Sequence, residues 1–388
     1  MKMLSLFGAT GSIGDSTLKL VDEHPDRFSV TVMTAHSNYE KLAQLALKYK
    51  PSLVVIADSQ YEAALATCLL GTSIQVASGV DALCEAARMP VDCVVAGIVG
   101  FAGLMPVRAA VESGQTIALA NKETLVAAGH LIMPLAAVSG ATLLPVDSEH
   151  NAIAQCLVGA RDADIDKIVL TASGGPFRAL SRAEMHHATI EQALLHPNWS
   201  MGQKITIDSA TMMNKGLELI EAAWLFGLGS NRLEALIHPQ SIIHGLVSYC
   251  DGSWLAHMGP ADMRVPLSYA LGYPDRLAWQ AELLDLAQIA RLDFQPVCLE
   301  QFPCFGMAKS IIGTDPADAV TLNAANEMAV HNFLSGEILF GEIAEQVDTI
   351  LSEKRLGSAN SFDDILALDQ EVRKSALLLS SSPHHPNT

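Results

Sequence analysis

A glycine-rich turn near the start of the chain restricts its fold more than any other feature. The turn GATGSIG (8–14) follows the apolar run Lys2–Phe7 and precedes the amphipathic stretch Ser16–Asp22. Glycines at this spacing allow a tight turn between strand and helix, and they let backbone amides approach a pyrophosphate at the positive end of the helix. A purely structural turn would look similar, but the strand–turn–helix context favours a dinucleotide-binding βαβ unit.

The alternation of strand and helix patterns continues to residue 146. Helical patterns such as Glu40–Tyr49, Gln60–Leu70 and Leu125–Val138 separate further strand-like runs at Ser29–Thr34, Leu53–Ala57, Cys93–Ala96, Thr116–Leu119 and Ala141–Val146. This alternation predicts a Rossmann-type parallel sheet with helices on its faces. Only 5% of the residues are aromatic, while Ala, Leu, Val and Gly dominate, as suits helices packed on such a sheet.

A chain of 388 residues is too long for one ordinary core. The pattern changes at Asp147, after which a strand (Lys167–Thr171), a helix (Met212–Phe226) and a strand near Ser241–Tyr249 are expected, with a long polar stretch between that is typical of a lid. We therefore expect an α/β protein with a dinucleotide-binding domain (1–146), a central α+β catalytic domain with a mobile lid (147–273), a connector (274–302), a C-terminal helical domain (303–379) and a polar tail (380–388).

Charge and cysteine content exclude several classes of protein. The net charge of -18 argues against nucleic acid as a partner, because phosphodiester backbones need a basic surface. Seven scattered cysteines without a paired motif indicate a reducing compartment and no structural zinc site. The apolar start is cut by Gly8 and lacks a cleavage pattern, and no apolar run is long enough for a membrane span. We expect a cytoplasmic protein that does not bind membranes.

The end of the second strand indicates which dinucleotide is bound. An NAD site usually has Asp or Glu there to accept a hydrogen bond from the ribose 2′-hydroxyl. This chain has Ala35-His36-Ser37-Asn38, which offers donors and no carboxylate, so a 2′-phosphate is tolerated. The sequence therefore favours NADPH, although none of these four residues is Arg or Lys.

Three acidic side chains suggest a divalent cation. Asp147 and Glu149 follow an apolar run, and on an extended segment they would point the same way. A solvated acidic turn is the alternative. Glu218 lies among the apolar residues of a helix, where a carboxylate needs a partner, and three oxygen ligands suit Mg²⁺ or Mn²⁺. Glu221, one turn further on, is an alternative ligand or a group that supports one.

Polar residues near these acids could bind a phosphate. Ser209, Asn214 and Lys215 lie in DSATMMNKG (208–216), and Ser173 begins an SGGP turn that could present backbone amides to an anion. SGGP alone is most often only a turn. Trp199 in HPNWSMG (196–202) is typical of a lid that excludes water, although it could also pack onto its own core.

Eight motifs in order give the chain a resemblance to a known family. They are GATGSIG (8–14), NKE (121–123), DSEH (147–150), SGGPF (173–177), HPNWSMG (196–202), DSATMMNKG (208–216), HPQSIIH (238–244) and NAANE (323–327). From residue 3 to about 370 the chain resembles the 1-deoxy-D-xylulose 5-phosphate reductoisomerase family of the non-mevalonate isoprenoid pathway. The resemblance implies a homodimer that isomerises and reduces this sugar phosphate with NADPH and one Mg²⁺, Mn²⁺ or Co²⁺ ion.

The resemblance also implies roles for individual residues. The metal ligands would be Asp147, Glu149 and Glu218, and Lys122 is also counted as catalytic. His150 and His244 are counted as catalytic because they could carry protons or hydrogen bonds, although a lone histidine is more often structural. The substrate would be bound by Ser148, Glu149, Ser173, His196, Trp199, Met201, Ser209, Asn214, Lys215 and Glu218. The dinucleotide would be bound by Thr10, Gly11, Ser12, Ile13, Ser37, Asn38, Asn121, Glu123 and Gly202. Many relatives carry a basic residue near the second strand's end, where this chain has His36-Ser37.

Two other interpretations remain. A semialdehyde dehydrogenase-like reductase can share the glycine-rich turn, but it needs an activated cysteine, for which Cys156 is the candidate. A nucleotide-sensing regulator without chemistry would need neither the acids nor the phosphate-binding residues.

Overall fold

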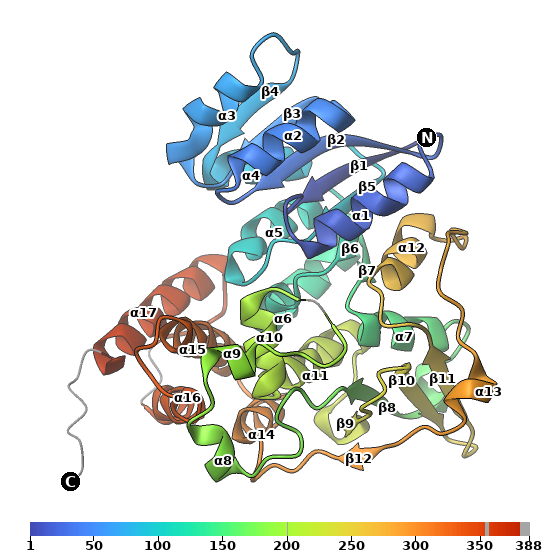
Figure 1. Cartoon of the computed structure of the whole chain (residues 1–388), viewed down its shortest axis with the longest axis vertical. Coiled ribbons are helices and arrows are strands. Elements are labelled where there is room, and N and C mark those ends of the chain that lie inside the picture. The colour runs from blue at the N-terminus through green and yellow to red at the C-terminus, as the bar shows by residue number, and fades with distance from the viewer. Residues whose placement is uncertain (200, 354–356, 381–388) are drawn as a thin grey trace. The chain divides into compact units, whose positions relative to one another are not determined.

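The computed structural model describes residues 1–199, 201–353 and 357–380, and Figure 1 shows the chain. The chain forms two compact units. Unit 1 comprises residues 1–124, 132–151 and 262–283, and unit 2 comprises residues 125–131, 152–261 and 284–388. The expected domain limits at 146, 273 and 302 stay predictions, and residues 381–388 of the expected tail lie outside the described residues.

Unit 1 is built on a parallel sheet of seven strands in the order β4-β3-β2-β1-β5-β6-β7. The order reverses at β1, so the turn that follows β1 lies where open α/β sheets bind ligands. The strands are β1 (Lys2–Phe7), β2 (Phe28–Ala35), β3 (Leu53–Ile56), β4 (Gln75–Ser78), β5 (Cys93–Ala96), β6 (Thr116–Leu119) and β7 (Thr142–Pro145). The sequence predicts all of them except the short edge strand β4.

The helices of unit 1 alternate with these strands. They are α1 (Ser12–Glu23), α2 (Tyr39–Tyr49), α3 (Glu62–Cys68), α4 (Gly79–Arg88), α5 (Leu104–Glu112) and α12 (Arg264–Gly272), while α6 (Lys122–Ser139) and α7 (Ser148–Cys156) have residues in both units. Leu4 and Leu6 of β1 are fully buried, and Leu267 and Leu271 of α12 belong to the same core. The late helix α12 therefore completes the dinucleotide-type unit that the first half of the chain begins.

Unit 2 contains a mixed five-stranded sheet in the order β11-β10-β8-β9-β12. Only β8 and β9 pair in parallel. The strands are β8 (Ile165–Ala172), β9 (Leu233–Ile237), β10 (Ile243–Tyr249), β11 (Trp254–Met258) and β12 (Gln295–Pro296). At one edge, β11 leaves Trp254 and Leu255 each 49% exposed.

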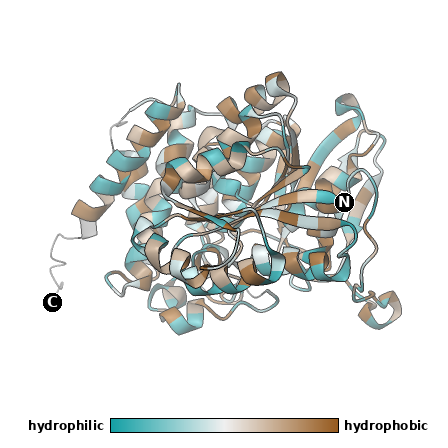
Figure 2. Ribbon diagram, turned by 90° about the horizontal axis from the view of Figure 1, so that it is seen from above, coloured by the Kyte–Doolittle hydropathy of each residue, from teal (hydrophilic) through white to brown (hydrophobic). Residues whose placement is uncertain are grey.

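Helices supply the rest of unit 2. They are α8 (Arg182–His186), α9 (Ile190–Ala193), α10 (Gln203–Ala210), α11 (Met213–Phe226), α13 (Leu286–Ile289), α14 (Pro303–Ser310), α15 (Pro316–Leu334), α16 (Glu342–Ser352) and α17 (Phe362–Ser380). The last three, orange to red in Figure 1, pack against one another. Many helices in Figure 2 are banded brown and teal, as expected of helices with one apolar and one polar face.

The expected α/β class, with a parallel sheet first, an α+β part next and helices last, is confirmed. Within the described ranges, no helix has both the length and the apolar character that crossing a bilayer requires.

Candidate active site

The glycine-rich turn of unit 1 is closely packed. Gly8 has φ +81°, and a Cβ on it would stand 2.5 Å from the carbonyl oxygen of Gly97. A Cβ on Gly14 would stand 2.3 Å from the carbonyl oxygen of Ala9. Side chains are excluded at both positions, which leaves backbone at the start of α1. Gly11 is the N-cap of α1 and provides no side-chain cap. The N-terminal end of α1 is therefore suited to an anion, and it contains the four residues expected to bind the dinucleotide, Thr10, Gly11, Ser12 and Ile13.

The loop after β2 brings a lysine to this turn that the sequence prediction missed. Ser37 is exposed, and Asn38 caps α2 by accepting a hydrogen bond from the Lys41 backbone at 3.1 Å. The Lys41 ammonium lies 3.0 Å from the carbonyl oxygen of Thr10 and 2.8 Å from a carboxylate oxygen of Asp15. A cation therefore does lie beside the glycine-rich turn. Its signal in the sequence is its place in the first turn of α2, three residues after the N-cap.

The NKE motif lies where β6 leads into α6. Asn121 is fully buried, and its side chain caps α6 through Thr124 and donates to the carbonyl oxygens of Ile98 and Gly100 at 2.7 and 2.8 Å. Glu123 is buried and accepts from the Asn121 amide at 3.3 Å. The Asn121 side chain thus ties two loops together, which leaves its backbone for the expected cofactor contact.

The acidic motif is helical and not extended, which corrects the geometry expected for it. Helix α7 begins at Ser148, and the Asn151 backbone N–H donates to the Asp147 carbonyl oxygen at 2.9 Å. Because the segment after Asp147 is helical, the expectation that Asp147 and Glu149 project together from an extended strand is wrong in its backbone geometry. Asp147 precedes the first turn as helix-capping residues do, and this local preference prevails over continuation of β7.

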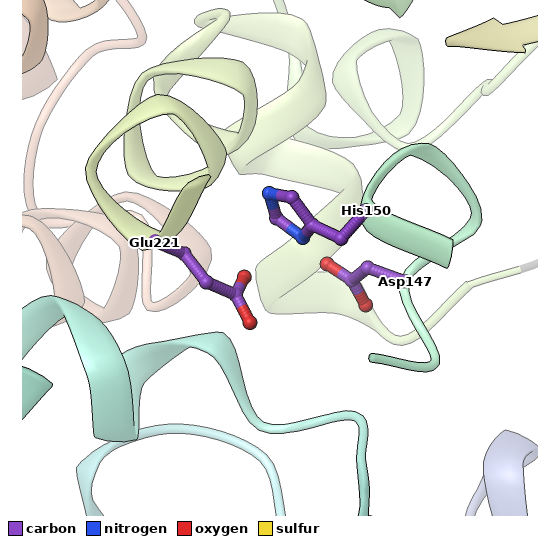
Figure 3. Close-up of side chains that lie close together, drawn as sticks. All are labelled: Asp147, His150 and Glu221. Atoms are coloured by element: carbon purple, nitrogen blue, oxygen red, sulfur yellow. The ribbon is translucent and has the colours of Figure 1, made fainter. Parts of the chain in front are cut away.

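Within unit 1, two of the expected catalytic residues form an ion pair. The Lys122 ammonium lies 2.5 Å from Asp147 Oδ2, and the two side chains are 7% and 17% exposed. Ser148 donates to Glu149 at 2.6 Å. His150 is completely buried. Figure 3 draws Asp147, which directly precedes α7, and His150 of α7, together with Glu221 of α11 in unit 2. The expected ligands Asp147 and Glu149 thus have charged or polar neighbours of their own.

In unit 2, His196 joins the SGGP turn to the lid segment. Its Nε2 lies 3.0 Å from Ser173 Oγ, and its Nδ1 accepts from the backbone N–H of Trp199 at 2.9 Å and of Asn198 at 3.3 Å. Because Nδ1 is an acceptor, the neutral ring carries its proton on Nε2, which then donates to Ser173. Ser173 Oγ in turn accepts from the Gly175 backbone at 3.1 Å.

The described part of the lid segment rests on β10 and the loop before it. The Asn198 amide donates to the Pro239 carbonyl oxygen and to Ser241 Oγ, both at 2.8 Å. The Trp199 ring meets the His244 ring edge-on, with centroids 6.1 Å apart. His244 itself is buried, and its Nε2 lies 3.1 Å from the Gly259 carbonyl oxygen. Met201 is half-buried and Gly202 is the exposed N-cap of α10. Ser200 lies outside the described residues.

The phosphate-binding candidates lie around the junction of α10 and α11. Ser209 is near the end of α10, and Asn214 and Lys215 are in the first turn of α11. Between them Met212 is buried with φ +60°, a conformation that costs a non-glycine residue free energy. Asn214 donates to Glu218 at 2.5 Å, and the ammonium of Lys215 also contacts Glu218. Lys215 and Glu218 are 3% and 1% exposed, so the structure brings the expected phosphate-binding cation and an expected metal ligand together as a buried ion pair.

Three family models match this chain. Residues 4–129 match 1-deoxy-D-xylulose 5-phosphate reductoisomerase, residues 143–226 match the C-terminal domain of that enzyme, and residues 258–375 match a further DXP reductoisomerase C-terminal domain. Together these ranges cover most of the chain, including every segment that carries a candidate site residue except the one around His244.

Curated relatives and solved structures agree with these models. The chain is 48% identical over 386 residues to 1-deoxy-D-xylulose 5-phosphate reductoisomerase of Tolumonas auensis, with 96% of this chain and 97% of the relative covered. It is 49% identical over 380 residues to that of Paraburkholderia xenovorans, with 97% and 95% covered. A structure of the Zymomonas mobilis enzyme in complex with NADPH has a TM-score of 0.92 at 45% identity, with 98% of this chain and 100% of that chain covered. A DOX-P reductoisomerase in complex with NADPH, fosmidomycin and magnesium has a TM-score of 0.94 at 41% identity, with 98% of each chain covered.

Proposed function

The chain belongs to the 1-deoxy-D-xylulose 5-phosphate reductoisomerase family, and from this premise we propose how its own residues carry out the reaction. It converts 1-deoxy-D-xylulose 5-phosphate (DXP) to 2-C-methyl-D-erythritol 4-phosphate with NADPH and a divalent cation, a step of isoprenoid biosynthesis. The assignment of residues rests on the hydrogen bonds of His196 in unit 2, which link Ser173 of the SGGP turn to the backbone of Trp199 in the lid.

The dinucleotide is assigned to the turn between β1 and α1. The close packing at Gly8 and Gly14 leaves backbone amides at a helix N-terminus with no side-chain cap, which fits a pyrophosphate. Ser37 and Asn38 are assigned to the ribose, and Lys41, which contacts the Thr10 carbonyl oxygen, would add the positive charge that a 2′-phosphate requires. Asn121, Glu123 and Gly202 complete the set that we assign to NADPH.

The cation is assigned to Asp147, Glu149 and Glu218, with Glu221 as an alternative ligand. Carboxylate oxygens are the ligands that Mg²⁺ and Mn²⁺ prefer. Asp147 and Glu218 are each paired with a lysine in this structure, and each would need another cation if its lysine turned to the substrate. The bound cation supplies Lewis acidity at the hydroxyl and ketone oxygens, and NADPH supplies the hydride. Lys122 and Ser148 then orient the hydroxyl and carbonyl region, while His150 supports the acidic motif from the same helix.

The substrate phosphate is assigned to Ser173, Ser209, Asn214 and Lys215. Lys215 and Glu218 neutralise each other in this structure, as buried charges must. Binding of the phosphate to Lys215 and of the cation to Glu218 would separate this pair while leaving both charges balanced. The phosphate replaces Glu218 as the partner of Lys215, and the cation replaces Lys215 as the partner of Glu218. Substrate and cation are therefore expected to bind cooperatively.

The lid is assigned to residues 196–202. His196 carries the connection, because one nitrogen meets Ser173 at the phosphate end while the other accepts from the backbone of Trp199. A phosphate that engages Ser173 would therefore order the lid through a single side chain. Trp199 and Met201 would then cover the reacting carbons and exclude water, with His244 supporting the indole ring.

The protein is proposed to act as a homodimer in the cytoplasm. The strand β11 lies at the edge of its sheet, pairs with β10 on one side and half-exposes Trp254 and Leu255, a combination that favours pairing with a second sheet edge. A second copy of the chain offers the same edge, so a two-fold pairing covers both β11 edges and leaves none of them for a third copy. All seven cysteines are free, which suits a reducing compartment.

The test of this function follows NADPH absorbance with DXP, with and without Mn²⁺, for the parent and for Glu218→Gln. Metal-dependent oxidation that the variant loses is the expected result. Oxidation that persists in a chelator or in the variant would overturn the metal assignment. A folded parent that binds NADPH but oxidises none would overturn the enzymatic function in favour of a regulator. The semialdehyde dehydrogenase alternative is disfavoured, because burial raises the pKa of the Cys156 thiol, whereas an activated cysteine has a lowered pKa.

A further inference from the structure

Helix α10 joins the two parts of unit 2 to which the substrate is assigned. It begins directly after the lid segment at Gln203 and ends at Ala210, one residue beyond Ser209. The position of this helix therefore decides both where the lid is anchored and where Ser209 stands. Neither its cap nor its composition secures it, because Gly202 gives no side-chain cap and the first turn contains no acidic residue.

A buried carboxylate in α10 is bound from two sides. Asp208 is 1% exposed, and its Oδ2 lies 2.9 Å from the ammonium of Lys204, one turn earlier. Its other oxygen, Oδ1, accepts a hydrogen bond of 2.8 Å from the Asn326 amide. Asn326 is completely buried in α15, 118 residues further along the chain, and belongs to the NAANE motif.

An ordinary surface ion pair does not explain this arrangement. Lys before Asp at a spacing of four is the less favourable order on a helix, and a lysine in the first turn opposes the helix dipole. A fully buried carboxylate is also costly unless its oxygens are bound. The contact with α15 accounts for the acid at this position, because it satisfies a buried carboxylate oxygen and joins α10 to another helix.

The segment after Asp208 requires firm support. Ser209 follows it directly, and Met212 holds a left-handed conformation three residues further on, just before Asn214 and Lys215. Such a conformation persists only where the surrounding structure fixes it. Thr211 Oγ1 donates to the Asp208 carbonyl oxygen at 3.2 Å, which ties the strained turn back to the anchored residue.

We propose that Asn326, acting through Asp208 and Lys204, is a positioning residue that sets the phosphate-binding segment and the base of the lid. The inference rests on the proposed function of Ser209 and Lys215. It gives the C-terminal helices, which carry none of the assigned substrate ligands, a defined part in substrate binding. Asn326 touches no substrate itself; its effect passes through the 2.8 Å hydrogen bond to Asp208.

The test compares Asn326→Asp with the double variant Asp208→Asn/Asn326→Asp in the full-length metal-loaded enzyme. The single variant places two carboxylates, at positions 208 and 326, opposite each other where the hydrogen bond was. The double variant restores one donor and one acceptor. We expect the single variant to raise KM for DXP about tenfold or more, with KM for NADPH changed less than about threefold, and the double variant to recover to within about threefold of the parent. NADPH is the internal reference, because every residue assigned to it except Gly202 lies in unit 1.

Asn332→Asp is the matched control, since Asn332 is also completely buried in α15 but donates to Gln346 at 3.3 Å instead. If the control raises KM for DXP equally, or if the double variant shows no recovery, Asn326 has a merely structural role and the proposal is wrong. If Asn326→Asp does not fold, Asn326→Ala is measured in the same way, and an unchanged KM for DXP would overturn the proposal. A parent that does not turn over DXP would instead overturn the proposed function.

Discussion

Gly175 lies directly against the backbone of Ser209, so that a Cβ built on the glycine would stand 2.6 Å from the serine carbonyl oxygen. Gly175 also has φ +66°, which favours glycine. The two residues come from different motifs, SGGPF and DSATMMNKG, and both motifs are assigned to the substrate phosphate. This close approach is therefore the packing contact that brings the two halves of the phosphate site together.

Replacing Gly175 with alanine is expected to push these two segments apart. The strained φ costs about 1–2 kcal/mol, and the clash with Ser209 adds to this cost. We expect a lower Tm and a KM for DXP raised about tenfold. Gly227→Ala is the control, because Gly227 has φ +64° but a Cβ on it would meet no atom within 4 Å, so only the backbone strain applies. An equal change of KM in both variants would contradict the steric argument.

The two nitrogens of His196 can be tested separately. In His196→Asn the amide oxygen falls near Nδ1, so the lid backbone keeps its acceptor while the contact with Ser173 is lost. In His196→Gln the amide reaches toward Ser173 while the acceptor for Trp199 is lost. Loss of one hydrogen bond costs about 1 kcal/mol, so we expect the asparagine variant to raise KM for DXP about fivefold and the glutamine variant mainly to lower kcat.

Steady-state kinetics of the two His196 variants check this prediction. Equal changes of KM and kcat in both would show that the histidine does not divide its two nitrogens between phosphate and lid. The Tm of each variant shows whether the fold is intact.

Local patterns in the sequence predict most of unit 1, whereas contacts between distant segments cannot be read from it. The period of the strands and helices and the turn at Gly8 are local, and six of the seven strands follow from them. The capping boxes that begin α8 at Ser181 and α9 at Thr189 are also local signals, yet both helices are too short to show a clear apolar period, and the stretch is predicted as irregular.

The site itself depends more on tertiary contacts. The motif residues are identifiable in the sequence, but the pairing of Lys215 with Glu218 depends on where both side chains are buried. The error at Asp147 has a different cause, because a residue that ends a strand and one that caps a helix look alike when they follow an apolar run. The contact between Asn326 and Asp208 spans 118 residues and has no local signal.

Lys41 is expected to contribute to the preference for NADPH. Its ammonium is held at the turn by the Thr10 carbonyl oxygen and by Asp15, where a 2′-phosphate would gain a charge-assisted hydrogen bond. Lys41→Gln should raise KM for NADPH about tenfold and leave KM for NADH unchanged. Lys48→Gln is the control on the same helix, because Lys48 is 58% exposed and pairs with Asp22. Equal changes for NADPH and NADH would contradict this role.

The edge strand β11 provides the test of the dimer. A lysine in place of Leu255 would put a charge into the proposed pairing of two sheet edges, where it would be desolvated. Sedimentation equilibrium should then show one chain of 41.3 kDa where the parent shows two. Val138→Lys is the control, because Val138 is 87% exposed on α6 and belongs to unit 1, whereas β11 belongs to unit 2. A variant at Leu255 that remains dimeric would place the interface elsewhere.

The ion pair between Lys215 and Glu218 predicts that cation and phosphate bind cooperatively. In the absence of an anion, Mn²⁺ must take Glu218 from Lys215 and leave a buried ammonium without a counter-charge, which is costly. Sulfate, which mimics the phosphate without precipitating Mn²⁺, should remove that cost. We expect calorimetry to show Mn²⁺ binding about tenfold tighter in sulfate. In Lys215→Gln the acid has no lysine to lose, so Mn²⁺ should bind as tightly without sulfate as with it. A parent whose Mn²⁺ affinity ignores sulfate would show that the pair does not separate on binding, and that the cation takes its oxygens from other acids.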